Sequence, residues 1–134
     1  MRYVILCSLL LLSFVSISCT QRACTWHEVT RFDPSSFGSA YSKQQEPFSV
    51  SGEKFRLRWT ASKLAAYGEG AGYFAIDLYR YPDMKLVESA VYDTDVGGEG
   101  EVHKVVVQAG KGMYCLFIYT GKYVGWAVHV DECT

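Results

Sequence analysis

Lys54-Phe55-Arg56-Leu57-Arg58-Trp59-Thr60 is the stretch that decides the fold class, because apolar and basic side chains alternate along it without a break. A period of two is typical of a β-strand that buries one face and exposes the other. We therefore expect a strand here, with one face basic and wet. Its apolar face must pack against another sheet to leave water.

Seven further runs of apolar or alternating residues surround this stretch, and turn residues separate them. All twelve glycines lie at position 38 or later, between the runs, as short antiparallel strands require. The polar, Ser/Gly-rich stretch 35–45 predicts a loop. The expected fold is all-β, a single antiparallel two-sheet β-sandwich of about eight strands in jelly-roll or Greek-key order. The further strands are expected at 26–32, 48–51, 73–81, 86–92, 102–108, 113–119 and 124–131.

The N-terminus has the three parts of a secretory signal peptide. Arg2 gives a positive start, an apolar run covers residues 4–15, and Ser16 and Ser18 precede Cys19. The run is shorter than the roughly 20 residues that a membrane-spanning helix needs. We expect cleavage after Ser18 and export of the protein. The expected segments are a signal peptide at 1–18, a short tether at 19–25 and the sandwich domain at 26–134.

Cys19 admits a second interpretation, because the signal of a lipoprotein also ends at a cysteine, which then carries the lipid. Ser16 departs from that pattern, which has an aliphatic residue three positions before the cysteine. Both forms stay open: a secreted protein, or one anchored on the outer face of a membrane through Cys19. Contact with a membrane is expected only through this anchor.

Four cysteines lie beyond the predicted signal, and an exported protein is able to form disulfides. Cys24 and Cys133 flank the first and last expected strands, so their pairing would join the two chain ends. The sequence alone does not choose among the three connectivities. If Cys19 carries a lipid, Cys115 is a free thiol; otherwise Cys19–Cys115 is a possible second bond.

The charge of the chain disfavours a nucleic-acid partner. The formal net charge is -1 and the pI is about 6.3, so no positive field surrounds the protein. The basic stripe Lys54, Arg56 and Arg58 is open to two interpretations. It either binds an anionic polymer or keeps the edge of a sheet soluble.

Three stretches resemble small exported sandwich domains of prokaryotic lipoproteins. They are Phe48-Ser-Val-Ser-Gly-Glu-Lys-Phe-Arg-Leu-Arg-Trp59, Gly112-Met-Tyr-Cys-Leu-Phe-Ile118 and Gly125-Trp-Ala-Val-His-Val130. The last two are similar to the closing hairpin of bacterial pre-peptidase C-terminal domains and of GOLD-like domains. The resemblance covers residues 26–131 and rests on core and turn patterns. It implies a sandwich with a binding or accessory role, and no catalytic residue.

The residues point away from an enzyme. No Gly-x-Ser-x-Gly motif occurs, and Cys115 lies within an expected strand instead of at a helix start. One alternative is a small metal-dependent or hydrolytic enzyme that uses His27, His129 and Asp131, which lie on the first and last expected strands. A metal site there would need at least three convergent ligands.

An acidic, glycine-rich loop is a candidate calcium site, although its spacing departs from that of an EF-hand. The candidate ligands are Asp93, Asp95, Glu99 and Glu101. A mobile, soluble turn explains the same residues. We expect no cofactor.

Aromatic side chains on the outward positions of two strands predict a binding surface. Together with a carboxylate they could stack on a sugar or hold a protein partner. The candidate residues are Asp77, Tyr79, Tyr81, Phe117 and Tyr119. The expected function is a non-enzymatic extracytoplasmic binding or interaction module, whose partner is an envelope protein or a surface glycan. Besides the enzyme, the other alternative is a structural envelope protein that assembles through its edge strands.

Overall fold

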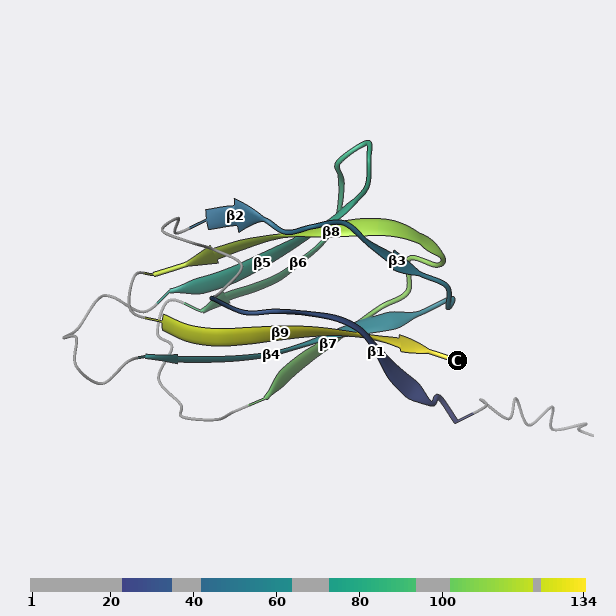
Figure 1. Cartoon of the computed structure of the whole chain (residues 1–134), viewed down its shortest axis with the longest axis horizontal. Helices are drawn as coiled ribbons and strands as arrows, with labels where there is room; N and C mark the ends of the chain where they lie inside the picture. The colour runs from purple at the N-terminus through teal and green to yellow at the C-terminus, as the bar shows by residue number, and fades with distance from the viewer. Residues whose placement is uncertain (1–22, 35–41, 64–72, 94–101, 122–123) are drawn as a thin grey trace, which may run out of the picture.

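The computed structural model describes residues 23–34, 42–63, 73–93, 102–121 and 124–134, which form two packed layers of strands (Figure 1). This part of the chain contains no helix long and apolar enough to cross a membrane. The strands in chain order are β1 (Trp26–Phe32), β2 (Ser42–Gln44), β3 (Phe48–Val50), β4 (Phe55–Lys63), β5 (Phe74–Arg80), β6 (Lys85–Asp93), β7 (His103–Val107), β8 (Gly112–Thr120) and β9 (Val124–Cys133).

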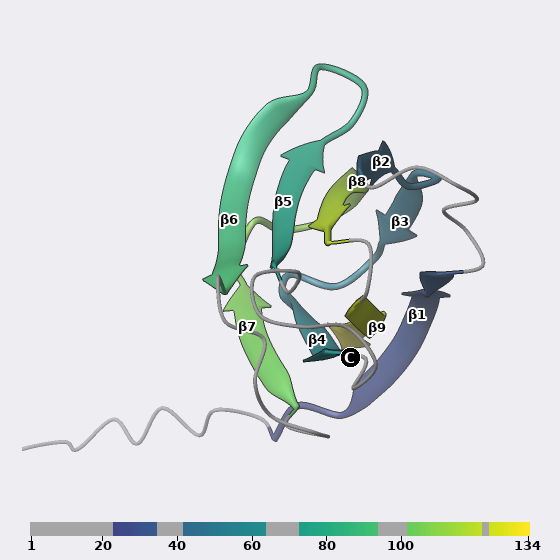
Figure 2. The ribbon, with the colours of Figure 1, turned by 90° about the vertical axis from the view of Figure 1, so that its left-hand side faces the viewer.

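The two antiparallel sheets have the strand order of a jelly roll. One sheet runs β1-β9-β4-β7, and the other runs β2-β8-β5-β6, with β3 also paired to β8 (Figure 2). Because β2 and β3 pair with successive parts of β8, they act as one interrupted edge strand. Counting them as one leaves eight strands in the described part of the chain. Renumbered 1 to 8 in chain order, these strands run 1-8-3-6 in one sheet and 2-7-4-5 in the other. The predicted all-β sandwich is confirmed.

Strand β2 corrects the prediction of a continuous loop over residues 35–45. Its three residues are too few to show an alternating pattern, but they pair with Phe117 to Tyr119 of β8. Gln45 continues the pairing, since its N–H donates to the carbonyl of Leu116 at 2.8 Å. The segment is therefore a strand because it pairs with the open edge of β8. The sequence of the segment itself does not show that this edge is available.

Alternation along the strands builds the core between the sheets. Phe55, Leu57 and Trp59 of β4 are buried, as their spacing predicts. The rings of Phe55 and Tyr114, which come from opposite sheets, lie with centroids 4.8 Å apart. The Tyr114 hydroxyl donates to the carbonyl of Gly110 at 2.6 Å, so this buried polar group is satisfied.

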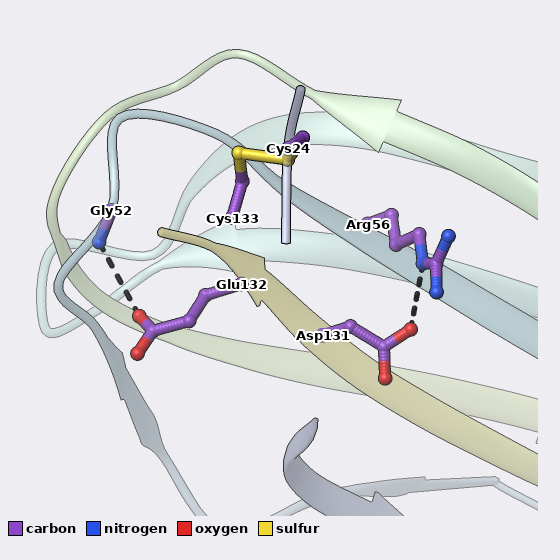
Figure 3. Close-up of a disulfide and its surroundings, with 6 residues drawn as sticks. All are labelled: Cys24, Gly52, Arg56, Asp131, Glu132 and Cys133. Carbon is purple, nitrogen blue, oxygen red and sulfur yellow. Dashed lines mark hydrogen bonds and ion pairs between the residues drawn. A yellow bond between two sulfur atoms is a disulfide. The ribbon is translucent and has the colours of Figure 1, made fainter. Parts of the chain in front are cut away.

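The two ends of the described chain are joined. Cys24 and Cys133 form a disulfide with Cα atoms 5.4 Å apart, which confirms the predicted pairing (Figure 3). Beside it, Thr25 and Thr134 exchange backbone hydrogen bonds of 3.3 and 3.0 Å. Cys115 is a buried free thiol. The disulfide is compatible with an extracytoplasmic location.

Candidate functional site

A row of four side chains crosses the sheet β2-β8-β5-β6 on its outer face, the side turned away from the core. Gln44 is paired with Phe117, Phe117 with Asp77, and Asp77 with Ser89. Directly opposed residues of antiparallel strands point to the same side of a sheet. An amide, a ring, a carboxylate and a hydroxyl therefore stand side by side; we call these four residues the cross-strand row.

Asp77 is the most enclosed member of the row, with 7% of its surface exposed. The hydroxyl of Ser89 donates to its Oδ1 at 2.6 Å. Among the residues that the structure describes, no other group donates a hydrogen bond to this carboxylate. Oδ2 can therefore still accept hydrogen bonds. The β5–β6 pairing shifts register between Ile76 and Asp77, and such a bulge re-aims the side chains next to it.

Aromatic rings lie beside this carboxylate. Phe117 and Tyr119 of β8 are half-buried, with ring centroids 5.0 Å apart and ring planes inclined by 32°. Tyr119 lies opposite Ala75 of β5. Tyr79 follows Asp77 on the same face of β5 and is also half-buried. The structure thus brings four of the five predicted binding residues onto one face.

Tyr81, the fifth predicted residue, lies beyond the end of β5. Its N–H donates to the carbonyl of Met113 at 2.9 Å, and 36% of its surface is exposed. It belongs to the turn between β5 and β6, which rises past β8 on the outer side of the sheet (Figure 1). Tyr81 therefore borders the face and is not part of the cross-strand row.

Cys115 points to the same outer face as Phe117 but is fully buried. Met84, from the turn between β5 and β6, covers it: the thiol Sγ and the Met84 Sδ are 3.6 Å apart. This burial raises the pKa of the Cys115 thiol, so the group stays protonated. The geometry is that of a packed cysteine beside the candidate site.

The sequence does not predict two members of the cross-strand row. Gln44 belongs to β2, in the stretch that the sequence predicts to be a loop, and its side chain is exposed. Ser89 lies in β6, where two register shifts against β5 break the simple alternation. Only the pairing of four strands places both residues beside Phe117 and Asp77, so no local pattern pointed to them.

The outer face of the other sheet holds a closed ionic cluster. Asp131 of β9, with 3% of its side chain exposed, accepts from Arg56 Nε at 2.7 Å (Figure 3). It also accepts from Arg58 Nη2 at 2.9 Å. Arg58 Nε also bonds to the same carboxylate. These two guanidinium groups, Arg58 foremost, hold the pKa of Asp131 below its usual range.

This cluster corrects the expectation of a wet, basic face on β4. Strand β4 lies inside its sheet, between β9 and β7, so its arginines do not keep a sheet edge soluble. Arg56 and Arg58 are half-buried, and the Arg56 guanidinium lies 4.4 Å from the centre of the Trp26 ring. Asp131 and, at 3.8 Å from Arg58, Glu28 therefore offset the charges of the two arginines within the protein.

The residues of the enzymatic alternative do not share a face. His129 and Asp131 lie on the outer side of β9, and His129 Nδ1 is 2.6 Å from Glu28 Oε2. His27 is the neighbour of Glu28 in β1 and is paired with Glu132, so it points to the opposite side of the sheet. Across the described residues, no three His, Cys, Asp or Glu side chains gather as metal ligands.

Some predicted residues lie outside the described part of the chain. They are the lipidation candidate Cys19 and the calcium candidates Asp95, Glu99 and Glu101. The side chain of Asp93, which ends β6, is also outside it.

Comparisons with models of known families, with curated proteins and with solved structures find no match to this chain. The resemblance to pre-peptidase C-terminal and GOLD-like domains stays a prediction from sequence. Function is therefore inferred from the residues of the site.

Proposed function

We propose that this protein is an exported, non-enzymatic binding module that recognises a component of the cell envelope. Its binding face is the outer side of β2, β8, β5 and β6, centred on Phe117 and Asp77. The observation that carries this proposal is the cross-strand row, in which four different chemical groups from four strands are in register. Rigid strands hold such groups in place more closely than loops do.

The other sheet is a weaker candidate for the same role. Its outer charges are paired: Asp131 with Arg56 and Arg58, and Glu28 with Arg58 at 3.8 Å. A partner that displaced these contacts would first have to break charged hydrogen bonds, which lowers the net gain of binding. The face of the cross-strand row instead offers an open carboxylate oxygen and rings.

Assembly through β6, one of the edge strands, is disfavoured by the pairing and the charges of this strand. Its pairing with β5 shifts register twice, and Lys85 and Glu88 place charges along it. Bulges and charged side chains are the means by which natural sheets prevent edge-to-edge association. Size-exclusion chromatography tests this directly, because a binding module of this kind elutes as a monomer.

Binding is tested by co-sedimentation of the purified protein with envelopes of the producing organism. We expect saturable binding, which the Phe117→Ala/Tyr119→Ala double variant loses. Val106→Ala is the matched control, because this residue is 46% exposed on β7 of the other sheet. The absence of saturable binding by the folded wild type, or equal binding by the double variant, would contradict the proposal.

Export is tested separately by the intact mass of the protein from membrane and medium fractions. We expect a chain that lacks residues 1–18 and is lighter by two hydrogens for Cys24–Cys133. The added mass of a lipid on Cys19 would distinguish the anchored form from the secreted form. A full-length chain with both cysteines reduced would contradict export.

A further inference from the structure

We infer that the ligand of the cross-strand row is a neutral carbohydrate, with a sugar ring over Phe117 and sugar hydroxyls on Asp77 and Gln44. This inference rests on the proposed function, because it names the ligand class of the same face. It depends on three observations: an enclosed carboxylate with an open oxygen, an aromatic strip beside it, and the absence of basic groups from the row.

The carboxylate of Asp77 has room for further hydrogen-bond donors. An ionised carboxylate accepts up to about four hydrogen bonds, and among the described residues Ser89 supplies one of them, to Oδ1. With 7% of its surface exposed, Asp77 meets solvent over a small area, so a ligand that donates to Oδ2 has few water molecules to displace. Vicinal sugar hydroxyls donate as a pair to one carboxylate, and these charge-assisted bonds are the stronger kind.

The rings supply the apolar half of the contact. Phe117 and Tyr119 are neighbours along β8, and their planes differ by 32°. They form a strip of two rings, tilted to each other, along one strand. This arrangement suits the apolar C–H side of a sugar ring, whereas a quaternary ammonium group is held by several ring faces that surround it. The strip therefore favours a flat ligand over an organic cation.

The charge of the face disfavours acidic ligands. The cross-strand row contains one carboxylate and no Lys or Arg. An anionic polymer would bring its charge toward Asp77 with no cation in the row to offset the repulsion. Gln44, exposed beside Phe117, instead offers an amide that both donates and accepts, which matches hydroxyl groups.

The length of the row fits a short oligosaccharide. Gln44 and Ser89 lie at opposite ends, three strand steps apart, on β2 and β6. At about 4.8 Å for each step, the row spans roughly 14 Å, the length of about three sugar units. Both end residues are exposed and the middle is enclosed, so the strongest contact is expected at the central sugar, over Phe117 and Asp77.

The test is a printed array of neutral, acidic and amino oligosaccharides, followed by calorimetry with cellotriose, maltotriose, chitotriose, trigalacturonate and choline. We expect binding to neutral glycans and none to trigalacturonate or choline. Asp77→Asn keeps the shape of the side chain and the bond from Ser89, and it should weaken binding by about tenfold or more. Gln44→Ala, at an exposed position, should weaken it about threefold to tenfold, and Val106→Ala should leave it unchanged.

The outcomes separate the two proposals. If no neutral glycan binds, while envelopes still bind through Phe117 and Tyr119, the carbohydrate is ruled out and the binding face stands. If acidic glycans or choline bind more tightly than neutral glycans, the ligand class is likewise wrong. If neutral glycans bind equally well to Asp77→Asn and Gln44→Ala, both of which fold, the cross-strand row is not their site. If nothing binds to this face, both proposals fail.

Discussion

Phe117 of β8 lies directly opposite Asp77 of β5, so a ring and an enclosed carboxylate share the outer face of one sheet. Side chains so opposed have Cβ atoms about 4.5–5.5 Å apart, close enough for one ligand to contact both. Their relation is set by backbone register, since the two residues are 40 positions apart in the chain. Whatever holds the sandwich together therefore also holds the site.

The ionic cluster around Asp131 is expected to contribute substantially to stability. Asp131→Asn removes the charge that faces the half-buried Arg56 and Arg58, and it leaves Glu28, 3.8 Å away, as the carboxylate beside Arg58. We expect a loss of about 2–3 kcal/mol in the free energy of unfolding, below the value for a fully buried pair because both arginines reach solvent. Chemical denaturation measures this loss, and a change within experimental error would show that the cluster is energetically neutral.

Acid is expected to weaken the fold through two neighbouring carboxylates. Hydrogen bonds from Arg58 lower the pKa of Asp131, and the backbone N–H of Ser51 lowers the pKa of Glu132. The unfolded chain therefore binds protons more readily, so this stability is present above the ordinary carboxyl range and is lost below it. Denaturation midpoints should fall between about pH 5 and pH 2.

The Asp131→Asn variant serves as the control for this pH dependence. It retains only the contribution of Glu132 among these two groups, so its denaturation midpoint should fall less steeply with acid. A variant whose pH dependence matched that of the wild type would exclude Asp131 as a source of acid sensitivity.

The disulfide is expected to be a major source of stability. Cys24 and Cys133 are 109 residues apart, and closing so long a loop restricts the unfolded chain by about 4–5 kcal/mol in the chain-entropy account. The double variant Cys24→Ser/Cys133→Ser should unfold at much lower denaturant. The wild type treated with a reductant should match it, and the reductant should have no effect on the double variant itself.

Cys115 is expected to be unreactive in the folded protein. Its side chain is fully buried against Met84, and burial raises the pKa of its thiol, so little of the reactive thiolate forms. A thiol reagent such as a maleimide should label Cys115 only after denaturation. Rapid labelling of Cys115 under native conditions would show that the outer face opens at this point.

Gly52 is expected to tolerate no side chain, because the β3–β4 turn passes close to the C-terminal end of the chain. A Cβ atom at Gly52 would lie 2.6 Å from the carbonyl oxygen of Cys133. Gly52→Ala should therefore cost about 1–3 kcal/mol of stability, since backbone has to move. Glu53→Ala, at a neighbouring exposed position, is the control and should have little effect.

Much of the fold could be predicted because its signal is local. The strand around Phe55, Leu57 and Trp59 shows its period of two within seven residues, and the same pattern marks Trp126, Val128 and Val130. Strand β2 could not be predicted from its sequence, because its three residues depend on the edge of β8 for their hydrogen bonds. The position of β4 inside its sheet depends on its pairing with the distant strands β9 and β7, so alternation alone does not predict that its arginines are half-buried.

The candidate site could be predicted only in part. Alternation along β5 and β8 correctly placed Asp77, Tyr79, Phe117 and Tyr119 on the outward side. It could not show that Asp77 faces Phe117, because register between distant strands depends on all the pairings together. Nor could it find Ser89, which reaches Asp77 across a bulge.

The central claim is that the outer face of β2, β8, β5 and β6 holds the ligand. The most direct test is to follow the backbone amide NMR signals of the isotope-labelled protein during titration with the neutral trisaccharide that binds most tightly in calorimetry. We predict that the largest shifts occur at Gln44, Asp77, Ser89 and Phe117, with little change on β1, β4, β7 and β9. Shifts centred on those other strands, or no localised shifts at saturation, would contradict the account.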